Sequence, residues 1–120
     1  MKIESISIDE IEFDNGSVLD SEHRQDCCEH HYVDFTSMED QFSKKTEFPE
    51  NLNDLVVLDY NSEKDNIRGE EYTTFVILQD KKGRKYTLNI YNENNGYYGT
   101  EVILVLTTKK GKETRLLIQK

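Results

Sequence analysis

Apolar residues in this chain recur mostly at every second position, which is the period of a β-strand with one buried face. The clearest example is KYTLNIY, residues 85–91, in which Tyr86, Leu88 and Ile90 share one face. The shorter segments ISI at residues 6–8 and IEF at residues 11–13 alternate in the same way. The pattern predicts strands in all three segments and places Tyr86, Leu88 and Ile90 in the core.

Three further segments are continuous apolar runs rich in β-branched residues. They are LVVLDY at residues 55–60, TTFVILQ at residues 73–79 and VILVLTT at residues 102–108. Such runs are typical of strands that are buried on both faces or lie near the centre of a sheet.

Helical signals are confined to two segments. TSMEDQFSKK, residues 36–45, has an N-cap candidate at Thr36 or Ser37, and Met38 and Phe42 lie four positions apart on one face. This spacing predicts one short helix there, and PENLNDL at residues 49–55 predicts a single helical turn.

Glycines mark the connections between strands. Asn15-Gly16 predicts a tight hairpin in which both residues have positive φ, with residues 17–23 returning as the second arm. QDKKGRK at residues 79–85 and TKKGKETR at residues 108–115 predict two more hairpins, each with one glycine and a local cluster of lysines. The expected fold is mainly β: a single domain over residues 1–120, with about seven or eight mostly antiparallel strands forming a small barrel or rolled sheet, and one short helix.

The charge of the chain is unevenly distributed. The 120 residues carry a net charge of −9; residues 1–65 hold 18 acidic and 5 basic residues, whereas residues 66–120 hold 6 acidic and 10 basic residues. An acidic protein of this kind is a poor ligand for phosphate backbones, so we expect no direct binding to nucleic acid. An acidic face suits a basic protein partner, and nucleic-acid mimicry is one form of such a contact.

Features of the sequence also predict the compartment. The first residues, MKIESISIDE, contain no apolar stretch of the kind found in a secretory signal, and no run of about 18 apolar residues exists. Two cysteines do not make a disulfide framework. We therefore expect a cytoplasmic protein without a membrane contact.

The segment DCCEHHYVDF, residues 26–35, contains the most reactive side chains of the chain. The candidate metal ligands are His23, Cys27, Cys28, His30 and His31. Zinc takes such thiolate and imidazole ligands, but adjacent cysteines depart from the usual C-x₂₋₄-C spacing. The aromatic and β-branched residues predict a strand, which places Cys27 and Cys28 on opposite faces and leaves only a two-ligand pair on each face.

Three other interpretations of this segment remain open. One cysteine packs inside as a small hydrophobe while the other lies near the surface, or the two form a strained vicinal disulfide, or one is a nucleophile beside a histidine base. The neighbouring acids raise the pKa of a thiol, which argues against an activated nucleophile. We therefore predict no catalytic residues and no cofactor, with zinc as the alternative.

A second candidate is NENNGYYGTE, residues 92–101. Tyr97 and Tyr98 on such a loop are candidates for partner binding, because tyrosine gives a large contact area at low entropy cost. The alternative is that one ring covers the core and the other is exposed without a role.

Two motifs of this chain resemble those of an uncharacterised family of small proteins in bacterial and phage genomes. The first motif, H-x-Q-D-C-C-E followed by tyrosine, is formed by His23, Gln25, Asp26, Cys27, Cys28, Glu29 and Tyr32. The second is formed by Tyr91, Asn92, Asn95, Gly96, Tyr97 and Tyr98, with Gly99 where the family pattern has serine. The resemblance spans roughly residues 3–106. It implies a shared fold and a role for the cysteine pair, without an activity.

These observations predict a small, non-enzymatic protein that acts through contact with an unknown protein partner, and that derives from a phage or mobile element. The first alternative is a zinc-binding module centred on the Cys-Cys-Glu-His-His cluster. The second is an acidic mimic of nucleic acid.

Overall fold

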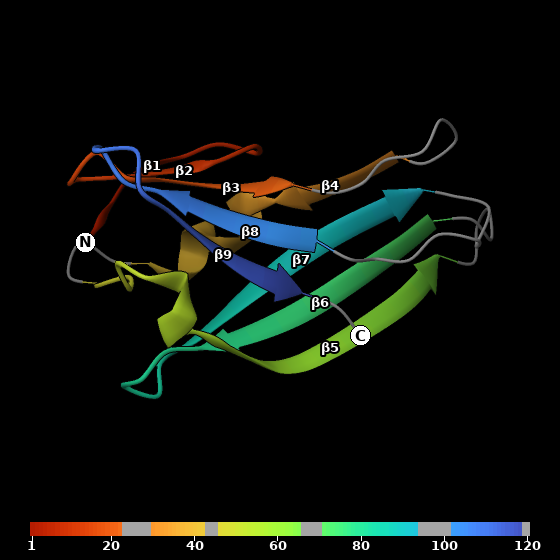
Figure 1. The fold of residues 1–120 in the computed structure, drawn as a ribbon. Helices are drawn as coiled ribbons and strands as arrows, with labels where there is room; N and C mark the ends of the chain where they lie inside the picture. The colour runs from red at the N-terminus through yellow and green to blue at the C-terminus, as the bar shows by residue number, and fades with distance from the viewer. Residues whose placement is uncertain (23–29, 43–45, 66–70, 94–101, 119–120) are drawn as a thin grey trace.

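The structure, a computed structural model, describes residues 1–22, 30–42, 46–65, 71–93 and 102–118. These residues form two antiparallel sheets with two short 3₁₀ helices beside them (Figure 1). The first sheet has the order β1-β2-β3-β8-β9 and consists of β1 (Ile3–Ile6), β2 (Ile11–Phe13), β3 (Val18–Glu22), β8 (Val102–Thr107) and β9 (Glu113–Ile118). The second has the order β4-β7-β6-β5 and consists of β4 (His30–Asp34), β5 (Val56–Asp65), β6 (Glu71–Gln79) and β7 (Lys85–Glu93). The predicted mainly antiparallel β fold is confirmed, and the two sheets are compatible with a rolled arrangement.

The core lies between the two sheets and is built from alternate residues of their strands. Tyr86, Leu88 and Ile90 of β7 are at most 1% exposed, which confirms the face predicted from their spacing. The first sheet contributes alternate residues in the same way, among them Leu104 and Leu106 of β8. Their burial in one cluster is the main favourable term that holds the sheets together.

Three hairpins share one hydrogen-bond pattern. In the β2–β3 hairpin, Phe13 N donates to the Ser17 carbonyl oxygen (2.9 Å) and Gly16 N donates to the Phe13 carbonyl oxygen (3.0 Å). The β6–β7 and β8–β9 hairpins repeat this pattern around glycines with φ of +84° and +89°. This is the pattern of a three-residue loop with glycine in the left-handed region.

The three-residue loop corrects one prediction. Gly16 has a φ of +83°, but Asn15 does not have a positive φ. Only the third loop residue needs the left-handed conformation here, whereas a two-residue loop would have required it at both positions.

The structure also corrects the prediction for LVVLDY. The run forms the start of β5, which is the last strand of its sheet, and Val56 and Leu58 are 54% and 48% exposed. These two side chains are therefore neither buried on both faces nor near the centre of a sheet. The same prediction holds for β6 and β8, because each lies between two other strands.

The predicted short helix is present as the 3₁₀ helix η1 (Phe35–Gln41). Its N-cap is Asp34 and not Thr36 or Ser37, because the Asp34 carboxylate accepts a hydrogen bond from Thr36 N at 3.0 Å. Phe35 consequently belongs to the helix, so the predicted strand over residues 26–35 is confirmed only for His30–Asp34; residues 26–29 lie outside the described part. The predicted helical turn is η2 (Leu52–Asp54).

Within the described part of the chain, no helix has the length and apolar character needed to cross a membrane.

Candidate functional site

Most residues of the two predicted sites lie outside the described ranges. This applies to His23, Cys27, Cys28, Tyr97 and Tyr98. The backbone of His30 and His31 lies in β4, opposite Glu93 and Asn92 of β7. Among the described residues, no three His, Cys, Asp or Glu side chains are grouped so that they could hold a metal ion. The zinc site and the tyrosine contact therefore stay predictions. The prediction that Cys27 and Cys28 lie on opposite faces of a strand can be tested with a thiol reagent, which should react with the two cysteines at unequal rates.

Among the described residues, the free edge of β5 is the candidate binding surface. This strand pairs with β6 on one side only, and no described residue pairs with its other side. It runs for 10 residues, so it presents a long row of backbone donors and acceptors along one edge of the sheet (Figure 1). Such an edge is a template for pairing with another extended chain.

An apolar strip lies beside this edge. Val56 and Leu58 are exposed on the outer face of the sheet, the face directed away from the core. Phe75 and Ile77 of β6 alternate with the buried Val76, so they lie on the same outer face, and both are partly exposed. We call Val56, Leu58, Phe75 and Ile77 the β5 strip.

A β-bulge shapes the strip. Val57 pairs with Leu78 and Asp59 pairs with Ile77, so Leu58 is the extra residue of β5. The Asp59 carboxylate holds the bulge, because it accepts hydrogen bonds from Tyr60 N (2.8 Å) and Asn61 Nδ2 (3.0 Å). As a result, an apolar and an acidic side chain are exposed next to each other on the edge strand.

On the opposite side of the same sheet, side chains cover the backbone edge of β7 that β4 leaves without a strand partner. From the last residue of β4 onwards, the backbone of β7 is covered by η1: Asn89, which lies opposite Asp34, donates from its backbone N to Ser37 Oγ at 3.1 Å. Gln41 uses both ends of its carboxamide, since Nε2 donates to the Thr87 carbonyl oxygen (2.7 Å) and Oε1 accepts from Thr87 N (2.5 Å). The described residues provide no comparable cover for β5.

The outer face of the other sheet carries charged side chains around a buried apolar residue. Val105 of β8 is only 3% exposed, and Arg115 of the neighbouring strand β9 forms ion pairs with Glu22 and Glu113. Partial burial, followed by the charges of Glu22 and Glu113, raises the pKa of the Asp20 carboxyl on the same face. A dense polar network therefore lies on this face, in contrast to the β5 strip.

Sequence reasoning missed the β5 strip because an apolar run reports a strand but not the order of strands in a sheet. The signal that was present is the end of the run, where Asp59 and Asn61 alternate with Tyr60. This alternation indicates a strand with one solvated face.

Comparison with known proteins gives a family without an assigned role. Residues 2–104 match the family model described as Domain of unknown function (DUF7448). No curated protein and no solved structure matches the chain.

Proposed function

The chain belongs to the family described as a domain of unknown function (DUF7448), and from the geometry of β5 we propose a function for it. The protein is a non-enzymatic binding protein that accepts an extended segment of a partner protein along β5. The observation that carries this proposal is the edge of β5 with which no described residue pairs, beside the exposed side chains of Val56 and Leu58.

The two parts of this surface have different roles in binding. The backbone groups of β5 supply hydrogen bonds to any extended chain, whatever its sequence. The β5 strip supplies selectivity, because an added strand places every second side chain over Val56 and Leu58. Burial of these side chains stabilises the complex by removing apolar surface from water.

Charge defines the kind of partner. The sequence of β5 contains Asp59, Glu63 and Asp65 but one basic residue, Lys64, and the whole chain carries a net charge of −9. We therefore assign the partner a basic segment with apolar residues at alternate positions. A second copy of this chain is disfavoured, because its own β5 repeats the negative charge. On the basis of the motif resemblance, we further propose that the protein derives from a phage or mobile element.

A titration with model peptides tests the proposal. A peptide of alternating lysine and valine should shift the backbone amide NMR signals of β5 in the full chain, while a peptide of alternating glutamate and valine should not. The double variant V56K/L58K should weaken the binding by about tenfold or more, because it replaces the apolar contact with like charge.

The matched control is Leu117→Lys. Leu117 is also an exposed leucine on a strand, at 43%, but it lies on β9 of the other sheet. This variant should bind the peptide as the unmodified protein does. Equal binding by V56K/L58K, or amide shifts that avoid β5, would rule out the proposed surface.

A further inference from the structure

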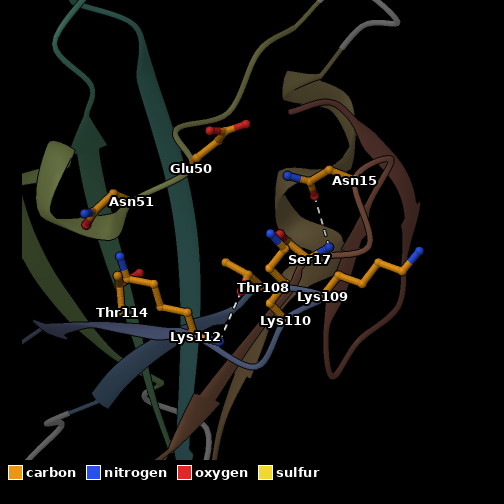
Figure 2. A pocket seen from close by; sticks show the side chains of 9 residues that line it. All are labelled: Asn15, Ser17, Glu50, Asn51, Thr108, Lys109, Lys110, Lys112 and Thr114. Atoms are coloured by element: carbon orange, nitrogen blue, oxygen red, sulfur yellow. Dashed lines mark hydrogen bonds between the residues drawn. The ribbon is translucent and has the colours of Figure 1, made fainter.

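A hollow of about 570 Å³ lies where three segments meet that are far apart in the sequence (Figure 2). Its walls are the β2–β3 loop, the residues just before η2, and the β8–β9 hairpin. The volume is within the range of about 300–1,000 Å³ that is usual for pockets that bind small molecules. We call this hollow the hairpin pocket; none of the β5 strip residues lines it.

Two asparagines in the wall each accept a backbone hydrogen bond with their side-chain oxygen. Asn15 Oδ1 accepts a hydrogen bond from Ser17 N at 3.0 Å, as the dashed line in Figure 2 shows. Asn51 Oδ1 accepts from Asn53 N at 2.8 Å. A carboxamide whose oxygen is engaged by the backbone has its NH₂ group left for another partner, and that group only donates.

Two threonines in the wall also accept a backbone hydrogen bond with their side-chain oxygen. Thr108 Oγ1 accepts from Lys112 N at 3.1 Å, and Thr114 Oγ1 accepts from Leu52 N at 3.3 Å. Each hydroxyl oxygen thus accepts a hydrogen bond from a backbone N–H, and the hydroxyl proton is left to donate. The wall of the hairpin pocket is therefore rich in donors.

Ser17 supplies an independent observation. It lines the hairpin pocket and is only 2% exposed, yet its hydroxyl group bonds none of the described residues. Buried polar groups in proteins nearly always have a hydrogen-bond partner. A buried hydroxyl at the wall of a hollow, without a partner among the described residues, indicates a partner that enters the hollow.

Positive charge is concentrated at the same place in an acidic protein. Lys109, Lys110 and Lys112 line the pocket, and none of them forms an ion pair with any described residue. The stem of Lys109 packs against Gly16, and its end points away from the hollow (Figure 2). Lys110 and Lys112 remain as the cations for a ligand, and Glu50 is the one carboxylate among the lining residues.

We infer that the hairpin pocket binds the phosphate group of a small molecule. The phosphate oxygens accept hydrogen bonds from the hydroxyl groups of Ser17 and Thr108 and from the ammonium groups of Lys110 and Lys112. A tetrahedral phosphate fits better than a planar carboxylate, because the donors belong to two separate segments, the β2–β3 loop and the β8–β9 hairpin, and approach from different directions. This site is independent of the function proposed for β5.

An NMR titration of the full ¹⁵N-labelled chain at constant ionic strength tests the inference. Inorganic phosphate should cause saturable shifts of the Ser17, Thr108 and Lys112 amide signals, with at least about fivefold tighter binding than acetate. Glycerol 3-phosphate distinguishes the source: tighter binding than inorganic phosphate identifies an ester as the ligand, and equal binding identifies free phosphate. Shifts that rise linearly and match those caused by sodium chloride would overturn the site.

Variants separate a binding role from a structural one. K110M/K112M should weaken phosphate binding by about tenfold or more, whereas the control K82M/K85M, with the same change in charge on exposed lysines outside the pocket, should leave it unchanged.

Ser17→Ala should weaken binding several-fold and leave the free protein at least as stable, because it removes a buried hydroxyl that bonds none of the described residues. Loss of stability with unchanged binding would assign Ser17 a purely structural role and overturn its part in the site. An oligonucleotide that shifts the same amides at lower concentration than phosphate would overturn the small-molecule assignment.

Discussion

The hydroxyl oxygen of Tyr86 lies 3.1 Å from Asp80 Oδ2 and also 3.1 Å from the carbonyl oxygen of Glu47. One buried side chain of β7 therefore joins the β6–β7 hairpin to the segment that precedes η2. Its ring stacks on Phe42, with centroids 5.5 Å apart, and packs edge-on against Phe48 at 5.3 Å. Phe48 in turn stacks on Phe13 of β2, so this aromatic cluster connects the two sheets.

The position of Tyr86 predicts how stability depends on alkaline pH. Burial raises the pKa of the Tyr86 hydroxyl to about 12 from its ordinary value of 10. The folded state therefore holds this proton more tightly than the unfolded state. The stability due to Tyr86 is fully present below pH 10 and is lost as pH rises through about 12. Urea unfolding between pH 9 and 12 should show a steeper fall for the unmodified protein than for Tyr86→Phe, in which the group that ionises is absent. Parallel curves would contradict the prediction.

Leu88→Ala tests the buried face of β7. Leu88 is 0% exposed in the core between the sheets. Removing its side chain should lower the free energy of unfolding by about 2–5 kcal/mol, because apolar contacts are lost and a cavity remains. Lys85→Ala, at an exposed position of the same strand, is the control and should change stability by less than about 0.5 kcal/mol. A similar small change for Leu88→Ala would show that this face is not core.

Gln41→Ala tests how the edge of β7 is closed. The substitution removes both hydrogen bonds to the Thr87 backbone, so water replaces the carboxamide there. The expected loss of stability is about 1 kcal/mol. Hydrogen exchange at the Thr87 amide should become faster, since its acceptor is gone. Asp40→Ala, at the neighbouring exposed position of η1, should leave this exchange rate unchanged; a rate that rises equally in both variants would refute a specific role for Gln41.

Gly16 and Gly111 provide a matched pair. Both have a positive φ, so alanine at either position strains the backbone. A Cβ atom at Gly16 would also lie 3.1 Å from side-chain carbons of Lys109, whereas at Gly111 no atom lies within 4 Å. Gly16→Ala should therefore reduce the unfolding free energy more than Gly111→Ala does in urea titrations. An equal reduction would mean that the Lys109 stem moves aside at no cost.

The sequence predicted those parts of the fold that depend on local order. Alternation identified Tyr86, Leu88 and Ile90, because a strand with one buried face repeats every two residues. The glycine of each hairpin marked its loop, because glycine adopts the left-handed region without steric cost. The prediction of a positive φ at Asn15 is wrong because the same Asn-Gly pair occurs in loops of either two or three residues.

The order of the strands and the hairpin pocket could not be predicted from local patterns in the sequence. The run that begins β5 would have the same composition in the centre of a sheet, and only its neighbours make it an edge. The hairpin pocket joins Ser17, Asn51 and Lys112, which belong to three distant segments. A pattern along the chain reports the backbone conformation of each segment, but the three-dimensional arrangement of the segments decides which side chains meet.

The strand order of the first sheet has a consequence for biosynthesis. β3 lies beside β8, with Val18 opposite Thr107, so the first sheet can be completed only after β8 has been synthesised. Closing so long a loop delays folding, because the entropy cost comes before the contacts that compensate for it. On the ribosome, the open side of β3 stays unpaired until residues 102–107 emerge. During that interval the unpaired edge of β3 exposes the nascent chain to aggregation.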